Sequence, residues 1–309
     1  MSAAGPKAAA PIKTPDFFLV TVTEGQSLRS LAATYLGDSG KWWQIAALNN
    51  VSRAVPGDTL VIARKDLHPG GLVPEGYRTV PVLAYLKLAG EKSGRLVVPR
   101  SAFERQMKFL RDNGYHPVSI DRLMDYLEMK SGLPPKAVVI TFDNGWRSVY
   151  DIAYPILKKY GFPATVFIYT DFIGAPKALT WKQLREMAGH GISVQSQTLS
   201  LPDLTRLPPK AGLQDHIRHL DRELGQSKAL IRKNIGAPCR YLAYPFGKTN
   251  DLVIAIAKKF GYRAGFTLNR GSNPFFVDNF KVRRSMIYGH YDLTQFAKNL
   301  KVFEPLELR

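Results

Sequence analysis

The chain of 309 residues contains a single cysteine, Cys239, so no disulfide can form within it. Its stability must therefore come from an apolar core, and 45% of its residues are hydrophobic, an ordinary share for a globular protein. A chain of this length is typical of one small domain followed by a domain of more than ~200 residues, which buries a sizeable core without cross-links. One cysteine is compatible with reducing and oxidising compartments alike.

Long apolar runs are also missing. No stretch approaches the roughly 20 consecutive apolar residues that a transmembrane helix needs, so we predict that the chain does not span a membrane. The first residues, MSAAGPKAAAPIKTP, lack the apolar centre of a signal peptide. We interpret residues 1–16 as a flexible leader rich in Ala and Pro, which is compatible with the start of a mature exported chain.

Acidic residues are scarce. Asp and Glu number 25 against 43 Lys and Arg, which gives a net charge of +18. Such a field attracts polyanions, whether nucleic acid, an anionic lipid surface or an acidic envelope polymer. The basic residues are spread along the chain without a dense tract or a nucleic-acid-binding motif, so we expect no nucleic-acid partner.

Residues 17–63 form a unit with the order strand, helix, helix, strand. A β-rich run covers 17–22, and Ser27 is placed to cap the first helix. The second helical pattern covers 43–49, and a Pro-Gly-Asp turn leads into a closing strand at 59–62. The pattern predicts a compact βααβ domain.

This unit resembles the LysM module. The matching residues are Val20-Thr21-Val22, Gly25, Ser27-Leu28, Leu31-Ala32, Tyr35, Gly37-Asp38, Trp43, Ile45, Leu48-Asn49, Gly57, Leu60 and Ile62. Most of the Leu, Ile and Trp residues among them are also what a small core needs. The resemblance implies that the unit binds N-acetylglucosamine polymers such as peptidoglycan or chitin.

The remainder of the chain alternates strands and helices. Residues 64–79 are rich in Gly, Pro and charge, and we expect a linker there. Strands are predicted at 80–85, 137–142 and 164–168, with helical patterns between them. This alternation predicts an α/β domain over 80–309, with a parallel sheet and helices outside it.

Polar residues stand directly after the buried strand at 137–142. They are Asp143-Asn144-Gly145, and a carboxylate at the carboxyl end of a parallel strand is well placed for catalysis. Taken alone, the same three residues fit a simple turn better than a catalytic site.

Residues 80–300 resemble the polysaccharide deacetylase family, the NodB-homology domain of carbohydrate esterase family 4. The resemblance rests on Asp143-Asn144-Gly145, Leu179-Thr180-Trp181 and the following helix, Gly191 to Leu204, Tyr244-Pro245-Phe246-Gly247, Ser227-Lys228, Arg283 to Ile287, and Phe296. It implies a distorted (β/α) barrel of the NodB type. It also implies an exported protein of the periplasm, cell wall or extracellular space that acts on amino-sugar polymers.

The resemblance assigns roles that this chain only partly fills. In the family, the first Asp of an Asp-Asp-Gly motif is the general base, which corresponds to Asp143. The second Asp and two His of a His-x-x-x-His motif hold a divalent metal, and those positions carry Asn144, Gln197 and Leu201 here. Neutral amides are weak ligands for a transition ion and Leu is none, so we expect no metal cofactor.

Histidines elsewhere offer little replacement. His190 precedes the second motif, and we expect it to face away from the site. His216 and His219 share a helix face, for which we expect a solvated role. His290 stays a candidate near the mouth of the barrel.

These features favour a pseudoenzyme that binds an envelope polysaccharide without cleaving it. Trp146, Tyr244 and Phe246 are the expected sugar-binding side chains, and Asp143 is either a vestigial base or a hydrogen-bond acceptor for the sugar. The expected partner is peptidoglycan or another N-acetylglucosamine polymer, with an acidic exopolysaccharide as a further partner. Two alternatives stay open: a metal-independent amidohydrolase that uses Asp143 as its base, and a structural envelope scaffold.

Overall fold

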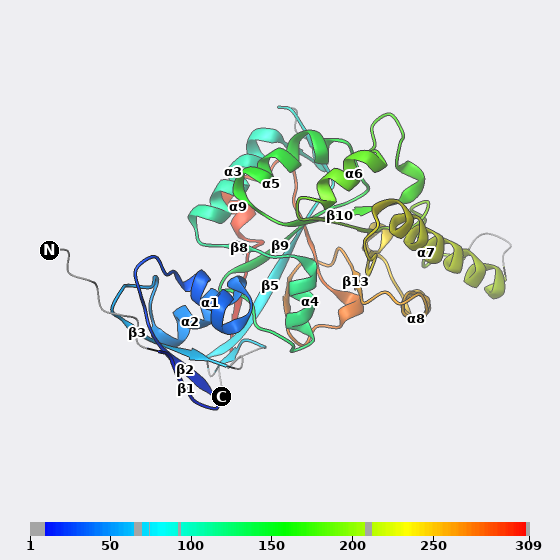
Figure 1. Cartoon of the computed structure of the whole chain (residues 1–309). Helices are drawn as coiled ribbons and strands as arrows, with labels where there is room; N and C mark the ends of the chain where they lie inside the picture. The colour runs from blue at the N-terminus through cyan, green and yellow to red at the C-terminus, as the bar shows by residue number, and fades with distance from the viewer. Residues whose placement is uncertain (1–9, 65–69, 74, 92–93, 208–211, 307–309) are drawn as a thin grey trace.

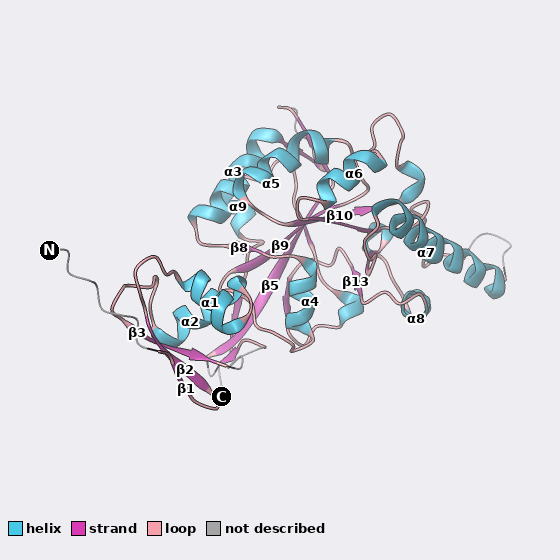
Figure 2. Ribbon diagram, in the orientation of Figure 1, coloured by secondary structure: helices cyan, strands magenta, loops and turns pink. Residues whose placement is uncertain are grey.

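A computed structural model describes residues 10–64, 70–73, 75–91, 94–207 and 212–306 (Figure 1). It consists of a small N-terminal unit, seen at the lower left in Figure 1, and a larger α/β part in which helices surround a curled sheet (Figure 2). None of the helices in these ranges is both long enough and apolar enough to cross a membrane.

The N-terminal unit has the predicted βααβ order. Its three-stranded sheet is formed by β1 (Ile12–Lys13), β2 (Phe17–Thr21) and β3 (Thr59–Ala63), and it carries α1 (Leu28–Leu36) and α2 (Trp42–Asn49). A short 3-10 turn, η1 (Ser39–Lys41), separates the two helices. The Oγ of Ser27 accepts from the backbone N–H of Ser30 at 3.1 Å, which confirms the predicted cap of α1.

Two predicted boundaries were wrong. Strand β1 lies inside the expected leader, because Ile12 and Lys13 pair with β2; residues 1–9 of that leader lie outside the described residues. The expected linker over 64–79 contains β4 (Leu72–Val73) and the start of β5 (Gly76–Tyr85), while 65–69 and 74 lie outside the description. The early half of β5 is a strand because β4 and β16 (Phe303–Pro305) pair with it on its two sides.

The main sheet is a curled run of parallel strands. Its order is β13 (Ala264–Phe266), β12 (Tyr241–Ala243), β11 (Ile192–Ser196), β10 (Ala164–Ile168), β9 (Ala137–Phe142) and β5. The predicted strands at 137–142 and 164–168 are confirmed to the residue. Strand β15 (Ser285–Met286) runs parallel to β5, while Val282 just before it bridges to β13, so this one segment contacts both ends of the curled sheet. We call this sheet with its helices the barrel.

Helices cover the outside of the sheet. They are α3 (Arg100–Asp112), α5 (Tyr154–Tyr160), α6 (Trp181–Ala188), α7 (Leu213–Ile235), α8 (Asp251–Lys259) and α9 (Leu293–Ala297). A π turn over Val149–Ala153 leads into α5. Smaller elements complete the description: β6 (Lys87–Ala89), β7 (Val97–Pro99), β8 (His116–Pro117) and an antiparallel edge strand, β14 (Ser272–Pro274).

Strand side chains alternate between two separate cores, as the period of a β-strand requires. Leu83 and Ile140 pack outward against the helices, whereas Val82 and Val139 pack into the barrel interior. Helix α4 (Ile120–Leu127) contributes to the interior core and so covers the amino ends of the strands. The carboxyl ends at the opposite edge, which we call the mouth, carry the polar residues described below.

The N-terminal unit is docked against the amino ends of the strands. The guanidinium of Arg122 on α4 lies 2.6 Å from the carboxylate of Asp38, and the ring of Trp42 packs on His116 with their centroids 5.5 Å apart. The unit also has a core of its own, centred on buried residues such as Leu31, Ile45 and Ile62.

Candidate active site

The mouth of the barrel gathers the residues that the motifs single out. Asp143 directly follows β9, Gln197 directly follows β11, and Tyr244 directly follows β12. Since carboxyl ends of parallel strands meet at one edge of a sheet, these three positions share the mouth.

A buried ion pair occupies the centre of this region. Arg284 donates to both carboxylate oxygens of Asp143, at 2.6 Å and 3.0 Å, and the two side chains are 0% and 2% exposed. The same guanidinium donates to the carbonyl of Thr267 at 3.0 Å and lies over the ring of Phe167. Little of the Asp143 carboxylate therefore remains for solvent or substrate.

Arg284 was not predicted as a site residue, although it stands in the matched segment Arg283 to Ile287. Its partner lies 141 residues away in sequence, so no local spacing could have shown the pairing. The only signal was an arginine inside a motif that ends on a short strand.

Asn144 and Gln197, two of the three expected metal-ligand positions, lie next to each other and are joined by a hydrogen bond. The Oε1 of Gln197 accepts from the backbone N–H of Asn144 at 2.7 Å, and the Gln197 side chain is only 3% exposed. The amide oxygen thus satisfies a backbone donor in the turn after β9. In this arrangement Gln197 acts as a structural clamp.

The loop after β11 is held from behind by Glu223 of α7, which is completely buried. One of its carboxylate oxygens accepts from the backbone N–H of Leu199 at 3.0 Å and of Ser200 at 2.9 Å. The other accepts from the Ser200 hydroxyl at 2.8 Å. Glu223 fixes the backbone that presents Gln197 and Leu201, and nothing in the sequence marked it as different from other helical glutamates.

The mouth also concentrates unusual backbone. Positive φ angles occur at Asn144 (74°), Thr198 (77°), Leu201 (63°) and Phe246 (59°). For a branched or bulky side chain this left-handed region is a genuine outlier, whereas Asn, Asp and His adopt it several-fold more readily. Such strain clusters at functional sites, where the surrounding structure imposes it.

The residues at the mouth do not fit the metal that the resemblance implies. Among the described residues, no three His, Cys, Asp or Glu side chains come close enough to share a metal ion. Asn144, Gln197 and Leu201 supply neither imidazole nor carboxylate, and Asp143 already faces a guanidinium. A divalent transition ion needs several such ligands around it.

The expected sugar-binding aromatics are placed differently from one another. Phe246 is 59% exposed at the mouth, and Trp146 is half-buried with its ring against Phe172 and under the ammonium group of Lys87. Tyr244 does not fit the expected stacking role, because it is completely buried.

The hydroxyl of Tyr244 donates to the carbonyl of Phe280 at 2.9 Å, and burial raises the pKa of this phenol. A Cβ at Gly265 would lie 2.0 Å from that hydroxyl, so glycine is required there for the Tyr244 ring to pack inward. The tyrosine of this motif therefore belongs to the core.

One of the histidines differs from expectation. His216 is only 4% exposed instead of solvated, and burial lowers its pKa, with a further contribution from the nearby His219. His190 lies exposed at the end of α6, with Nδ1 2.9 Å from the carbonyl of Glu186. His290 is exposed and stacks on Tyr288.

Comparison with known proteins is consistent with this geometry. The family model described as polysaccharide deacetylase matches residues 130–265, a span that holds Asp143, Gln197 and Phe246. Over this span the chain is similar to polysaccharide deacetylase domains of the NodB type. The N-terminal unit lies outside the matched span.

The deacetylase domain has curated relatives. The chain is 35% identical over 193 residues to a putative polysaccharide deacetylase, YxkH, of Bacillus subtilis, covering 62% of this chain. It is 29% identical over 191 residues to poly-beta-1,6-N-acetyl-D-glucosamine N-deacetylase of Staphylococcus aureus, covering 58% of this chain. The chain spans 66% of the length of each of these relatives, slightly under two thirds.

Solved structures share the fold. The deacetylase PplD of Streptococcus pyogenes, in complex with acetate, matches with a TM-score of 0.66 and 28% identity, over 72% of this chain and 98% of that one. IcaB from Ammonifex degensii matches with a TM-score of 0.64 and 27% identity, over 74% of this chain and 97% of that one. The curled α/β sheet is thus the framework of this deacetylase domain.

The buried ion pair generates a first prediction. Arg284→Met leaves the Asp143 carboxylate buried without its partner, which we expect to cost about 3–5 kcal/mol of unfolding free energy. Urea denaturation followed by circular dichroism measures it. Adding Asp143→Leu to the same chain should recover much of the loss, because the unpaired charge is then removed. Lys259→Met, which breaks the exposed pair with Asp221, is the matched control and should change little. If Arg284→Met and Lys259→Met lower the unfolding free energy equally, the buried pair contributes no more stability than the exposed one.

The Glu223 clamp generates a second prediction. Glu223→Met removes the acceptor for two backbone donors and one hydroxyl, and we expect a loss of about 2–4 kcal/mol. Glu223→Gln keeps a carbonyl oxygen for the two N–H groups and should lose less than half as much. Hydrogen exchange at the amides of Leu199 and Ser200 reports the same event locally, with faster exchange in the Met variant. Unchanged exchange at these two amides would contradict the clamp.

Proposed function

We propose that this chain binds an N-acetylglucosamine-containing envelope polysaccharide through a deacetylase domain that has lost metal-dependent deacetylation. The carrying observation is the composition of the mouth, where Asn144, Gln197 and Leu201 stand at the metal-ligand positions and Gln197 is bonded to the backbone of its neighbour. The polymer class is supported by the name of the Staphylococcus relative, an enzyme of poly-beta-1,6-N-acetyl-D-glucosamine.

The loss of the ligands removes the chemistry that a metal would supply. A catalytic ion polarises the acyl carbonyl and lowers the pKa of a bound water to about 7, which generates the nucleophile. The Asp143 carboxylate is held by Arg284, and without a metal ion a water at the mouth has neither activation. Asp143 stands at the general-base position, but a base alone does not replace the activation of carbonyl and water that the metal supplies.

The same mouth is suited to holding a sugar. Phe246 offers an exposed ring and Trp146 a half-exposed one, and aromatic faces pack well on the apolar faces of sugar rings. The strained backbone at Asn144, Thr198 and Leu201 is fixed from behind, so the loops are organised before a ligand arrives. Pre-organised loops lose less conformational entropy on binding.

We further propose that the N-terminal unit anchors the protein to peptidoglycan or chitin-like polymer, in keeping with its resemblance to LysM. A hollow of about 350 Å³ lies between the start of α1 and the loop after α2. It is lined by Gln26, Ser27, Leu28, Arg29, Trp42, Ser52, Arg53 and Ala54. Together the two parts describe an exported envelope protein that attaches to the wall and binds its glycan.

The proposal predicts that metal binding can be restored. The variant Asn144→Asp, Gln197→His, Leu201→His supplies one carboxylate and two imidazoles on backbone that these residue types adopt readily. We expect it to bind about one zinc ion per chain in a calorimetric titration, while the parent protein binds none at these positions. Acetate release from an acetylated glucosamine oligomer should be slow at best, because ligands need support within about 0.5 Å of productive geometry.

The parent protein is the control in both measurements. If the parent releases acetate at an enzymatic rate, the metal-independent amidohydrolase with Asp143 as base replaces our proposal. If the folded triple variant binds no zinc, the three positions do not converge on one point and their assignment to the metal site is wrong.

The anchoring role predicts a separable loss. Ser52→Trp fills the hollow of the N-terminal unit, and we expect it to reduce the fraction of full-length protein that sediments with insoluble peptidoglycan by about tenfold. Thr34→Trp adds the same side chain to an exposed site on α1 outside the hollow and serves as the control. If both variants sediment like the parent, the hollow does not hold the polymer.

A further inference from the structure

A chain of hollows crosses the face of the barrel opposite the mouth. The first lies between the N-terminal unit and the barrel, with a volume of about 500 Å³, and the next has about 380 Å³. The third, beside the end of α7, has about 640 Å³. Their walls include Pro163, Gly191 and Arg240, which stand immediately before or next to the first residues of β10, β11 and β12. These hollows therefore lie at the amino ends of the strands.

Neighbouring hollows share wall residues, so they adjoin one another. The first and second share Ser119, and the second and third share Ala237, Pro238 and Arg240. The first also shares Arg29 and Trp42 with the hollow of the N-terminal unit. We call the three hollows together the basal furrow. It runs from the N-terminal unit past α4 to the carboxyl end of α7.

The charges that line the basal furrow are almost all positive. Its cations are Arg29, Arg122, Lys228, Arg232, Lys233 and Arg240, and Asp121 is the one lining carboxylate among the described residues. Asp38 neutralises Arg122 at 2.6 Å, and Asp121 stands 3.4 Å from Arg240. Arg29, Arg232 and Lys233 make no ion pair with any carboxylate in the described ranges.

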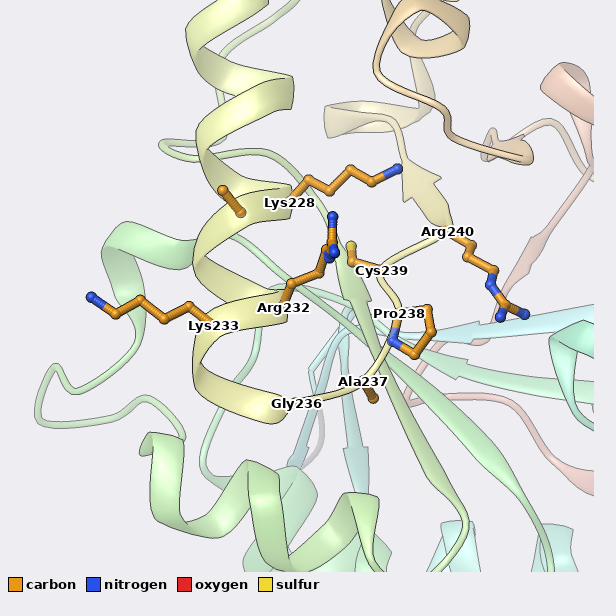
Figure 3. A pocket seen from close by; sticks show the side chains of 9 residues that line it. Lys228, Arg232, Lys233, Gly236, Ala237, Pro238, Cys239 and Arg240 are labelled. Atoms are coloured by element: carbon orange, nitrogen blue, oxygen red, sulfur yellow. The ribbon is translucent and has the colours of Figure 1, made fainter.

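The largest hollow carries the densest charge. Figure 3 shows Arg232 extending toward Cys239 and Lys228 passing above it, whereas Lys233 points away on the far side of α7 and Arg240 extends beyond Pro238. The ammonium group of Lys228 donates to the carbonyls of Phe260 and Gly261 at 2.7 Å and 2.8 Å, and its burial lowers its pKa. Arg232 is thus the cation of this hollow most available to an incoming anion.

The other end of the basal furrow carries aromatic rings. Trp42, Tyr115, Tyr160 and Phe162 line the first hollow and are all partly exposed. Trp42 packs on His116 and Tyr160 stacks on Phe162, so the rings offer only their remaining exposed surface to sugar rings, whereas free guanidinium and ammonium groups recognise carboxylates. A ligand that satisfies both ends has sugar rings and acidic groups along one chain.

We propose that the basal furrow binds an acidic polysaccharide whose sugars carry carboxylates. This inference goes beyond the proposed function, since it concerns the face opposite the mouth and does not depend on whether the mouth is catalytic. A polyanion without sugar rings would pair with the cations but would not pack on the aromatic rings at the other end. The net charge of +18 steers such a polymer toward the protein from a distance.

The test uses full-length protein and alginate, a soluble polyuronate, as the probe. Arg232→Gln with Arg240→Gln removes two furrow cations, and we expect the affinity for alginate to fall by about fivefold or more. Lys182→Gln with Lys298→Gln removes the same net charge from α6 and the segment after α9, and should change the affinity by less than about twofold. Thermal unfolding of each variant confirms that the fold is retained. In the parent, affinity should rise with the length of uronate oligomers, because longer chains reach the aromatic end.

Three outcomes would overturn the proposal. Equal losses in the two double variants would show only a long-range effect of net charge. Binding of a single-stranded oligonucleotide or of polyphosphate as tightly as alginate would show an unselective polyanion surface. Affinity independent of oligomer length would confine binding to one hollow. Sedimentation with peptidoglycan, measured on the same variants, should stay unchanged, so a failure here is distinguishable from a failure of the anchoring role.

Discussion

The buried ion pair between Arg284 and Asp143 joins the middle of the sheet to the segment that contacts both of its ends. Asp143 ends β9 in the middle of the sheet, and Arg284 belongs to the segment that bridges its two edges through Val282 and β15. Each charge is buried completely or nearly so, and each is tolerable only because the other is present. The ion pair therefore links the curl of the sheet to the position of the Asp143 carboxylate. The pair does not depend on which side chains stand at the metal-ligand positions.

The backbone of the mouth is held in part by contacts that are independent of the side chains at the metal-ligand positions. Glu223 holds the backbone of the loop after β11, and its bonds do not depend on which side chains that loop presents. Gln197 keeps the position of a ligand and uses its amide oxygen on the N–H of Asn144. Leu201 retains a left-handed backbone that suits histidine better than leucine. The scaffold of the mouth is thus held by contacts that do not depend on metal ligands.

The sequence was informative where local pattern determines structure, and silent where distant residues decide. Strands 137–142 and 164–168 were predicted correctly because continuous apolar runs in an α/β chain have few other solutions. The first residues of β5, Gly76 to Thr79, contain Gly, Arg and Thr, and they form a strand only because β4 and β16 pair with them. Tyr244 looked like a sugar-binding ring until Gly265, from another strand, was seen to leave space for it inside. Arg284 and Glu223 act across the fold, and no spacing within the sequence could show their partners.

The N-terminal unit and the mouth lie at opposite ends of the strands, with the interior core and α4 between them (Figure 1). A glycan strand seated on the N-terminal unit leaves the mouth facing away from it, free to take a different strand. Under the proposed function, the N-terminal unit and the mouth would give the protein two wall-glycan sites that face different ways. At equal occupancy it would join neighbouring strands into a network, and its influence on the wall would then be mechanical, set by the number of junctions and not by turnover.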